Sequence, residues 1–194
     1  MNNWRWILIL FVATLTFCKP NNENYQINGK LPTQDFDGEY VYLVPFENAT
    51  QNTVDSTLIH EGKFVFRGSS EQPEVCILRT RPLLRLQLEE ILIIKEPGIL
   101  NVTLASTSYA QGTVSNDSLQ KWKEVKSNID SMFRQVLIQY KSSSDSLAKQ
   151  KISLKLDSLK ELSSNFNQAF IETNKNNTAG EFVRKILGNN LSKE

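Results

Sequence analysis

Side chains that could do acid–base or nucleophilic chemistry are few in this chain of 194 residues. His60 is the only histidine, and the Glu-Gly dipeptide beside it predicts an exposed turn residue rather than a catalytic base. Glu89 and Glu90 are adjacent carboxylates, but neighbours in a strand point to opposite faces and do not form an acid–base couple. Phosphate loops, dinucleotide fingerprints and Gly-x-Ser-x-Gly elbows do not occur in the sequence. The sequence therefore predicts a protein that is not an enzyme and has no catalytic residues and no cofactor.

Cysteine chemistry is equally limited. One histidine and two cysteines, Cys18 and Cys76, cannot supply a zinc cluster or a disulfide framework, so no metal site is expected. Cys76 lies in the apolar run 75–78, which predicts a small buried hydrophobic residue. A reactive thiol would need basic surroundings, and only the nearby Arg79 and Arg81 favour that alternative.

Two sets of polar residues remain as candidate surface sites. Arg79, Arg81 and Arg85 could form a basic stripe on neighbouring strands that binds an anion or a lipid head group, although a solvated face is the simpler interpretation. The tripeptide Asp-Ser-(small or apolar) recurs and resembles the O-glycosylation acceptor of exported Bacteroidetes proteins. Asp and Ser are also common at helix starts and on polar faces, which explains the same pattern without modification. The candidate acceptors are Ser56, Ser118, Ser131, Ser146 and Ser158.

The amino terminus predicts export. Arg5 precedes the apolar run 7–17, which is shorter than the roughly 20 residues of a membrane-spanning helix, so residues 1–17 are interpreted as a signal peptide. Residues 15–18 (Leu-Thr-Phe-Cys) resemble the lipobox of bacterial lipoproteins, which implies lipidation, palmitate included, at Cys18. Phe17 departs from that pattern, where Gly, Ala or Ser is usual. The polar residues 18–24 would then be a tether, and the expected location is the cell envelope, lipid-anchored and facing the periplasm.

Turns cut residues 25–113 into short runs rich in β-forming residues. The expected strands cover 25–31, 40–44, 54–59, 63–67, 74–80, 84–95 and 99–104, and residues 60–62 (His-Glu-Gly) predict a hairpin turn between the third and fourth. Phe64 and Phe66 are expected on one buried face. Six to nine short strands at this spacing predict an antiparallel β-sandwich or an open barrel.

Helical periodicity begins after Gly112 and defines residues 114–194 as a helical region. Asn116 or Asp117 is expected to cap a first helix, and a second follows from about Asp145; each would be about 35–42 Å long, as in an antiparallel hairpin. Residues 178–181 (Thr-Ala-Gly-Glu) match a capping box that opens a short last helix. The first apolar stripe comprises Leu119, Trp122, Val125, Ile129, Phe133, Val136 and Tyr140, and the second Ala148, Ile152, Leu156, Leu159, Leu162, Phe166 and Phe170. The fold class is therefore α+β, a β-sandwich or open barrel followed by a long helical hairpin.

Charge excludes some functions and divides with the periodicity. A net charge of +1 argues against a nucleic-acid binder. Residues 19–113 carry 8 basic and 12 acidic side chains, whereas residues 114–194 carry 13 and 9. The opposite net charges of the two parts either help them to dock or only keep the protein soluble.

The order of several short motifs resembles a known family. These are 25–31 (YQINGKL), 41–43 (VYL), 54–57 (VDST) and 62–68 (GKFVFRG), followed by 96–98 (EPG), Gly112-Thr113, Asn116 and 174–183. Over residues 25–187 the chain resembles the amino-terminal domain of unknown function of Bacteroidetes thioredoxin-like thiol–disulfide oxidoreductase lipoproteins. Those proteins usually carry a following thioredoxin domain with a Cys-x-x-Cys motif, which this sequence does not contain, so no redox residue is implied here.

Two functions follow as hypotheses. The first is a non-catalytic cell-envelope lipoprotein that binds an envelope protein partner or ligand and is anchored to the membrane by its lipid. The second is the accessory or truncated part of a thiol–disulfide oxidoreductase system that acts with a thioredoxin-domain partner.

Overall fold

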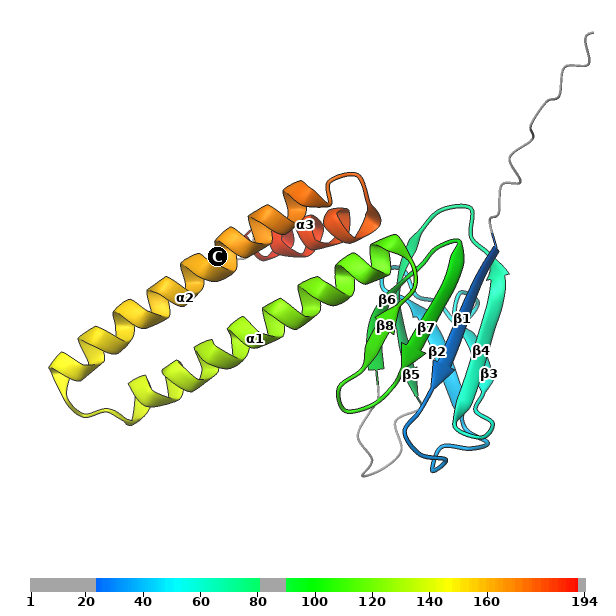
Figure 1. The fold of residues 1–194 in the computed structure, drawn as a ribbon, viewed down its shortest axis with the longest axis horizontal. Coiled ribbons are helices and arrows are strands. Elements are labelled where there is room, and N and C mark those ends of the chain that lie inside the picture. Colours follow the sequence, from blue (N-terminus) through cyan, green and yellow to red (C-terminus); the bar gives the residue numbers. More distant parts are fainter. Residues whose placement is uncertain (1–23, 81–89, 192–194) are drawn as a thin grey trace, which may run out of the picture.

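The computed structural model describes residues 24–80 and 90–191, which form a β-sandwich followed by three helices (Figure 1). Eight described strands make two four-stranded sheets: sheet A, in the order β4-β1-β7-β8, and sheet B, in the order β3-β2-β5-β6. Their bounds are β1 (Asn24–Lys30), β2 (Tyr40–Pro45), β3 (Asp55–Leu58), β4 (Lys63–Ser69), β5 (Glu74–Thr80), β6 (Glu90–Lys95), β7 (Gly98–Thr103) and β8 (Tyr109–Gln111). The predicted α+β sandwich with a helical hairpin is confirmed.

Strand pairing departs from the expectation in two places. β1 and β7 pair in parallel, while the other neighbouring strands of both sheets are antiparallel. The predicted hairpin of 54–59 with 63–67 is wrong, because β3 pairs with β2 in sheet B and β4 pairs with β1 in sheet A. The turn itself is correct: Glu61 and Gly62 adopt positive φ, and His60 and Lys63 form one isolated bridge before the strands separate. The turn therefore joins the two layers of the sandwich.

The sandwich core forms from alternate residues of both sheets. Phe64 and Phe66 are buried there, as predicted, with their ring centroids 6.1 Å apart. Gly29 lies against the Phe64 ring, and a Cβ at this position would approach its atoms to 1.8 Å. The remaining core residues include Ile27, Val41, Leu43, Cys76, Leu78, Ile91, Ile93, Leu100, Val102 and Leu104.

The helices are α1 (Val114–Ser142), α2 (Ser146–Thr173) and α3 (Thr178–Leu191). α1 and α2 run antiparallel as a long hairpin that projects from the sandwich, and α3 folds back beside their sandwich end (Figure 1). The second helix begins directly after Asp145, as expected, and the Asp145 side chain caps it by accepting a hydrogen bond from the amide of Leu147. The capping-box assignment is wrong by one residue, because Asn177 accepts the amide of Gly180 at the start of α3.

Neither Asn116 nor Asp117 caps α1, and Asn116 instead joins the helix to the sandwich. The N-cap of α1 is Thr113, and the buried Asn116 side chain faces β6, which is an edge strand of sheet B. Its Oδ1 accepts the amide of Ile94 at 2.8 Å, and its Nδ2 donates to the Ile94 carbonyl at 2.7 Å. One side-chain amide thus pairs both backbone groups that a further strand would have paired.

Two further contacts attach α1 to the same strand and its turn. Ser115 donates from both its amide and its hydroxyl to the Glu96 carboxylate, at 3.1 and 2.7 Å. The Lys123 Nζ donates to the carbonyl of Leu92 at 3.0 Å. Below them a second apolar cluster forms from Ile94, Leu119, Trp122, Phe170, Ala179, Phe182 and Val183.

Replacement of Asn116 by Leu tests this attachment. The substitution leaves the amide and the carbonyl of Ile94 buried without partners, so we expect the free energy of unfolding to fall by about 2–4 kcal/mol in urea titrations. Asn165→Ala, on the exposed side of α2, is the matched control and should change the free energy of unfolding by less than about 0.5 kcal/mol. A loss at Asn116 as small as that of the control would contradict the role of this amide.

Candidate functional site

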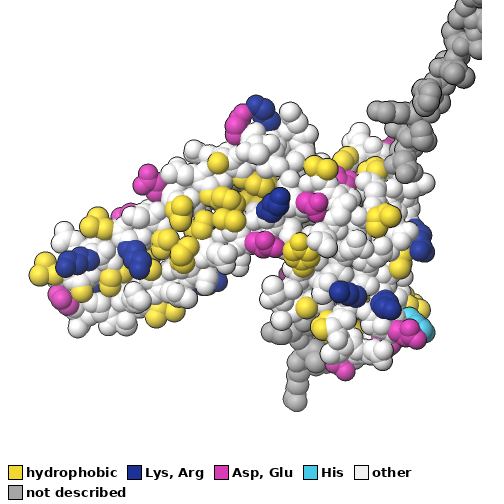
Figure 2. Space-filling view, viewed as in Figure 1, with side chains coloured by type: hydrophobic (Ala, Val, Ile, Leu, Met, Phe, Trp, Pro, Cys, Tyr) yellow, Lys and Arg dark blue, Asp and Glu magenta, His cyan; other side chains and the backbone are white. Residues whose placement is uncertain are grey.

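An open groove of about 640 Å³ lies where the three helices meet. Figure 2 shows hydrophobic side chains gathered over this part of the helical region, along the junction of α1 and α2. The groove is lined by Ile129, Asp130, Phe133, Leu159, Lys160, Ser163, Ser164, Asn167, Gln168, Ile171, Arg184, Leu187 and Gly188. Side chains from all three helices therefore contribute to one partly apolar surface.

The groove is open because α3 is too short to cover the hairpin. α1 and α2 have 29 and 28 residues, and α3 has 14, so at 1.5 Å per residue the third helix is about 20 Å shorter. Two antiparallel helices bury one stripe of side chains each against the other. The apolar side chains that flank this stripe stay exposed to solvent unless a third helix packs over them. Beyond α3, the side chains of Phe133 and Leu159 remain only half-buried.

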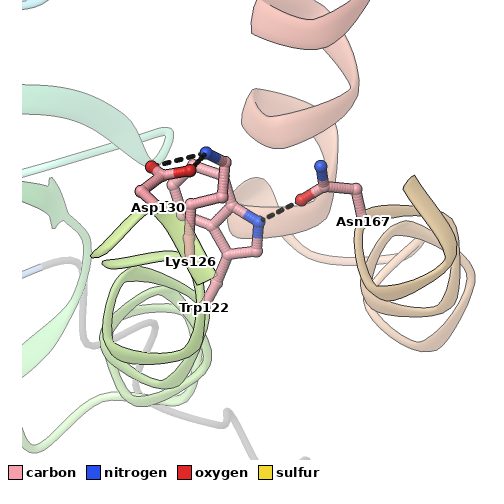
Figure 3. Close-up of polar contacts among 4 residues, drawn as sticks. All are labelled: Trp122, Lys126, Asp130 and Asn167. Carbon is pink, nitrogen blue, oxygen red and sulfur yellow. Dashed lines mark hydrogen bonds and ion pairs between the residues drawn. The ribbon is translucent and has the colours of Figure 1, made fainter. Parts of the chain in front are cut away.

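The wall of the groove is fixed by a buried polar contact between α1 and α2. The indole Nε1 of Trp122 donates to Oδ1 of Asn167 at 3.0 Å (Figure 3). The Trp122 ring also packs against Phe170, with 6.3 Å between the centroids. A tryptophan N–H that is buried needs such an acceptor, so the pair holds the two helices in one relative position.

Charges at the groove are mostly basic. Asp130 is paired with Lys126 one turn earlier, at 2.5 Å (Figure 3), which neutralises the one carboxylate of the lining. Lys160 lies 3.2 Å from Asp157 in an exposed pair, which contributes little. Among the described residues Arg184 takes part in no ion pair and is exposed on α3. The groove thus offers a free cation beside its apolar lining.

A second hollow, of about 700 Å³, lies between β6 and the side of α1. Its basic group is Lys123, whose burial lowers the pKa to about 8. A lysine with a lowered pKa could act as a base or a nucleophile. The Lys123 Nζ, however, already donates a hydrogen bond to the Leu92 carbonyl on β6. We therefore assign Lys123 to the attachment of α1 rather than to a reaction.

Cys76 is buried in β5, as the sequence predicted, with 1% of its surface exposed. Burial, and to a smaller extent the nearby carboxylate of Glu74, raises the pKa of the Cys76 thiol to about 12. A thiol in this environment is protonated at neutral pH and is not available for disulfide exchange.

The other predicted surface residues are dispersed. Arg79 lies on β5, where its cross-strand neighbour is Glu90, and Arg81 and Arg85 lie outside the described residues. The stripe of three arginines therefore remains a prediction. His60 is exposed at its turn, as expected, and Glu89 also lies outside the described part.

The serine and cysteine modification sites remain predictions. Ser56, Ser146 and Ser158 are exposed on β3 and α2, whereas Ser118 and Ser131 are half-buried on α1. The Ser158 hydroxyl donates to the Leu154 carbonyl within α2. Cys18, the signal peptide and residues 18–23 of the tether lie outside the described residues.

The groove was not predicted, because the apolar stripe expected on α2 left out the polar residues that face inward. The stripe is confirmed at Leu156 and Phe170, which are buried, but wrong at Leu162, which is 47% exposed. Ser163 and the buried Asn167 line the groove. The same error affects Val125 and Tyr140, which are exposed on α1. Ser163 and Asn167 stand at helical spacing from the apolar Leu156 and Phe170, and this spacing was the available signal.

Two classes of site find no support in the part of the chain that the structure describes. No cluster of three or more His, Cys, Asp or Glu side chains is placed to hold a metal ion there. None of the three helices combines the length and the apolar character that crossing a membrane requires.

Replacement of Lys123 by Met tests the burial of this amine. Between pH 8 and 10.5 the unfolded state binds more protons at Lys123 than the folded state, so the stability of the wild type relative to the variant should rise with pH across this window. Lys121→Met, at an exposed position of the same helix, is the control for the loss of one charge. A stability difference that stays constant from pH 7 to pH 10.5 would contradict the lowered pKa.

Comparisons with known proteins identify one part of the chain. No curated protein and no solved structure matches the chain significantly. A match to a family model covers a region from β1 through the first turns of α1, which includes both sheets and the Asn116 contact. Residues 25–119 match the family model described as a domain of unknown function (DUF4369).

Proposed function

We propose that the protein is a non-catalytic binding module of the cell envelope whose helical hairpin docks an amphipathic helix of a partner protein. The observation that carries this proposal is the open groove at the junction of α1, α2 and α3. An amphipathic helix in an apolar groove is a common mode of protein recognition.

Half-buried apolar side chains in the groove support a helical occupant. Phe133 and Leu159 line the groove and are only partly covered, so a docked partner helix would bury apolar surface that solvent now reaches. A partner helix placed after α3 would complete a three-helix cross-section over the length that α3 leaves open.

Charge indicates the polarity of the partner. Residues 114–194 carry 13 basic and 9 acidic side chains, and Arg184 borders the groove without an ion pair among the described residues. A partner helix with acidic residues beside its apolar stripe would complement this rim. We therefore propose an acidic amphipathic helix as the occupant.

The envelope location rests on the sequence. The charged start, the apolar run 7–17 and the lipobox-like end at Cys18 occur in the order of a lipoprotein signal. Lipidation at Cys18 would hold the sandwich near a membrane, with residues 18–23 as the tether. In this arrangement the hairpin projects from the sandwich and is available to a second envelope protein.

The alternative, an accessory role in a thiol–disulfide oxidoreductase system, is a narrower version of the same proposal. It requires that the docked partner carry a thioredoxin domain, since Cys76 is buried with a pKa of about 12 and offers no reactive thiolate. The identity of the docked partner separates the two hypotheses.

Photo-crosslinking in living cells tests the groove. A photoreactive residue in place of Ser163, inside the groove, should give a covalent adduct whose mapped peptide is an amphipathic helix with acidic residues. The same residue in place of Lys151, exposed on α2, is the control and should give no such adduct. Equal labelling at both positions, or labelling only of a second copy of this chain, would contradict the proposal.

A peptide made from the mapped helix then gives the affinity. Ser163→Glu places a negative charge in the groove, which repels an acidic partner helix, and should weaken binding at least about tenfold, with the melting temperature unchanged. An unchanged affinity would show that the peptide binds elsewhere.

Mass spectrometry of the mature amino terminus tests the anchor. We expect residues 1–17 to be removed and Cys18 to carry acyl chains, because two or more chains are needed for stable membrane anchoring. Cys18→Ala should release the protein from the membrane fraction. A free amino terminus at any residue after Cys18 would contradict lipidation.

A further inference from the structure

The outer face of sheet A is free of carboxylates. Its four strands, β1, β4, β7 and β8, contain no Asp or Glu, whereas the strands of sheet B contain Asp55, Glu74 and Glu90. The same four strands carry Lys30, Lys63 and Arg67, and all three side chains are exposed. In a part of the chain with more acidic than basic residues, this face is exclusively cationic.

Polar side chains fill the space between these cations. The strand register places Arg67 beside Gln26, Asn28 beside Asn101, and Asn101 beside Gln111. Figure 1 shows sheet A nearer the viewer, and in Figure 2 this side of the sandwich is mainly polar surface with basic groups, while acidic groups lie towards its rim. The acidic rim includes Asp37, whose carboxylate accepts the amides of Glu61 and Gly62.

Hydrogen bonds between these side chains run in one direction. Arg67 Nε donates to Gln26 Oε1 at 3.1 Å, and Gln26 Nε2 donates to Asn28 Oδ1 at 2.7 Å. Asn28 Nδ2 in turn donates to Asn101 Oδ1 at 3.3 Å. A guanidinium can only donate, so Arg67 fixes the orientation of every amide in the chain. Asn101 is therefore left with its N–H groups directed away from the relay and available to a ligand.

The pair Lys30 and Lys63 lowers the stability of sheet A when no ligand is bound. They are direct cross-strand partners on β1 and β4, and like charges in this position destabilise a sheet. Neither lysine forms an ion pair with any described residue. A bound anion between them would remove the repulsion.

We infer that the outer face of sheet A binds an acidic polysaccharide. The free groups of this face are N–H donors and cations, which match the hydroxyl, carboxylate and sulfate oxygens of such a chain. Tyr109 and Ile99 are 40% and 56% exposed at the edges of the donor array and provide apolar surface for sugar rings. Single-stranded nucleic acid would need a series of aromatic side chains for base stacking, and Tyr109 is the one exposed aromatic on these strands.

This surface is separate from the groove of the helical hairpin. The face belongs to β1, β4, β7 and β8, whereas the groove is lined by α1, α2 and α3, and no residue is shared. The two surfaces can therefore be tested independently.

Titration calorimetry of the full chain with polygalacturonate tests the inference, with neutral dextran and oligothymidylate of similar length as comparison ligands. We expect polygalacturonate to bind, dextran not to bind, and affinity to fall as salt is added. Lys30→Gln/Lys63→Gln should weaken binding at least about tenfold, since hydrogen bonds to charged groups are lost. Asn101→Asp, which keeps the shape of the side chain and adds a negative charge, should weaken it by a similar factor.

Lys151→Gln/Lys155→Gln is the matched control, because it removes the same charge from exposed positions of α2. This control should leave the affinity for polygalacturonate within about twofold, and so should the groove variant Ser163→Glu. Absence of polygalacturonate binding, equal weakening by the control, or tighter binding of oligothymidylate or dextran would overturn the inference. Circular dichroism melting of each variant confirms that the loss is not unfolding.

Discussion

The side-chain amide of Asn116 holds the two parts of the molecule together. β6 is the last strand of sheet B, and an open strand edge exposes backbone groups that must be paired. Asn116 pairs both backbone groups of Ile94, and Lys123, about two turns further along α1, donates to the Leu92 carbonyl. The direction of α1, and with it the position of the hairpin, follows from these contacts at the strand edge.

The position of the hairpin determines which surfaces remain free. α3 packs against the sandwich through Phe182, whose ring centroid lies 5.2 Å from that of Phe46. The ion pair between Lys185 and Glu47 joins the same two parts. α3 is then too far from the tip of the hairpin to cover it, and the groove stays open. Sheet A keeps its outer face exposed because α1 meets this sheet at its edge strand β8, where Gln120 accepts the amide of Ala110 at 3.3 Å. The protein thus has an apolar surface on its helices and a cationic, amide-rich surface on its sheet.

Much of the fold could be predicted from local sequence, and the failures have a common cause. Alternation and turn residues located the strands, including the buried Phe64 and Phe66, and helical spacing located the hairpin. Pairing between distant segments was not predictable: the turn at Glu61 and Gly62 is local, but the separation of β3 from β4 depends on strands elsewhere in the chain. β1 and β7 pair in parallel for the same reason.

The site was less predictable than the fold. Choosing apolar residues alone selected Leu162 for the core, whereas Ser163 and Asn167 face inward because Asn167 accepts the Trp122 N–H. Asn116 was expected at a helix cap, since the strand edge that it pairs is 22 residues away in sequence. A buried polar residue is identified by its partner, and single-residue propensity does not reveal that partner.

Amide hydrogen exchange at Ile94 tests the central structural claim most directly. The Ile94 amide lies on the open edge of β6, and its described partner is the Asn116 side chain. If Asn116 attaches the helical hairpin to the sandwich, this amide should exchange only through unfolding, with a protection free energy close to the global value and equal to that of the inner strand β5. Exchange at the rate of an exposed edge amide, while β5 stays protected, would contradict the account.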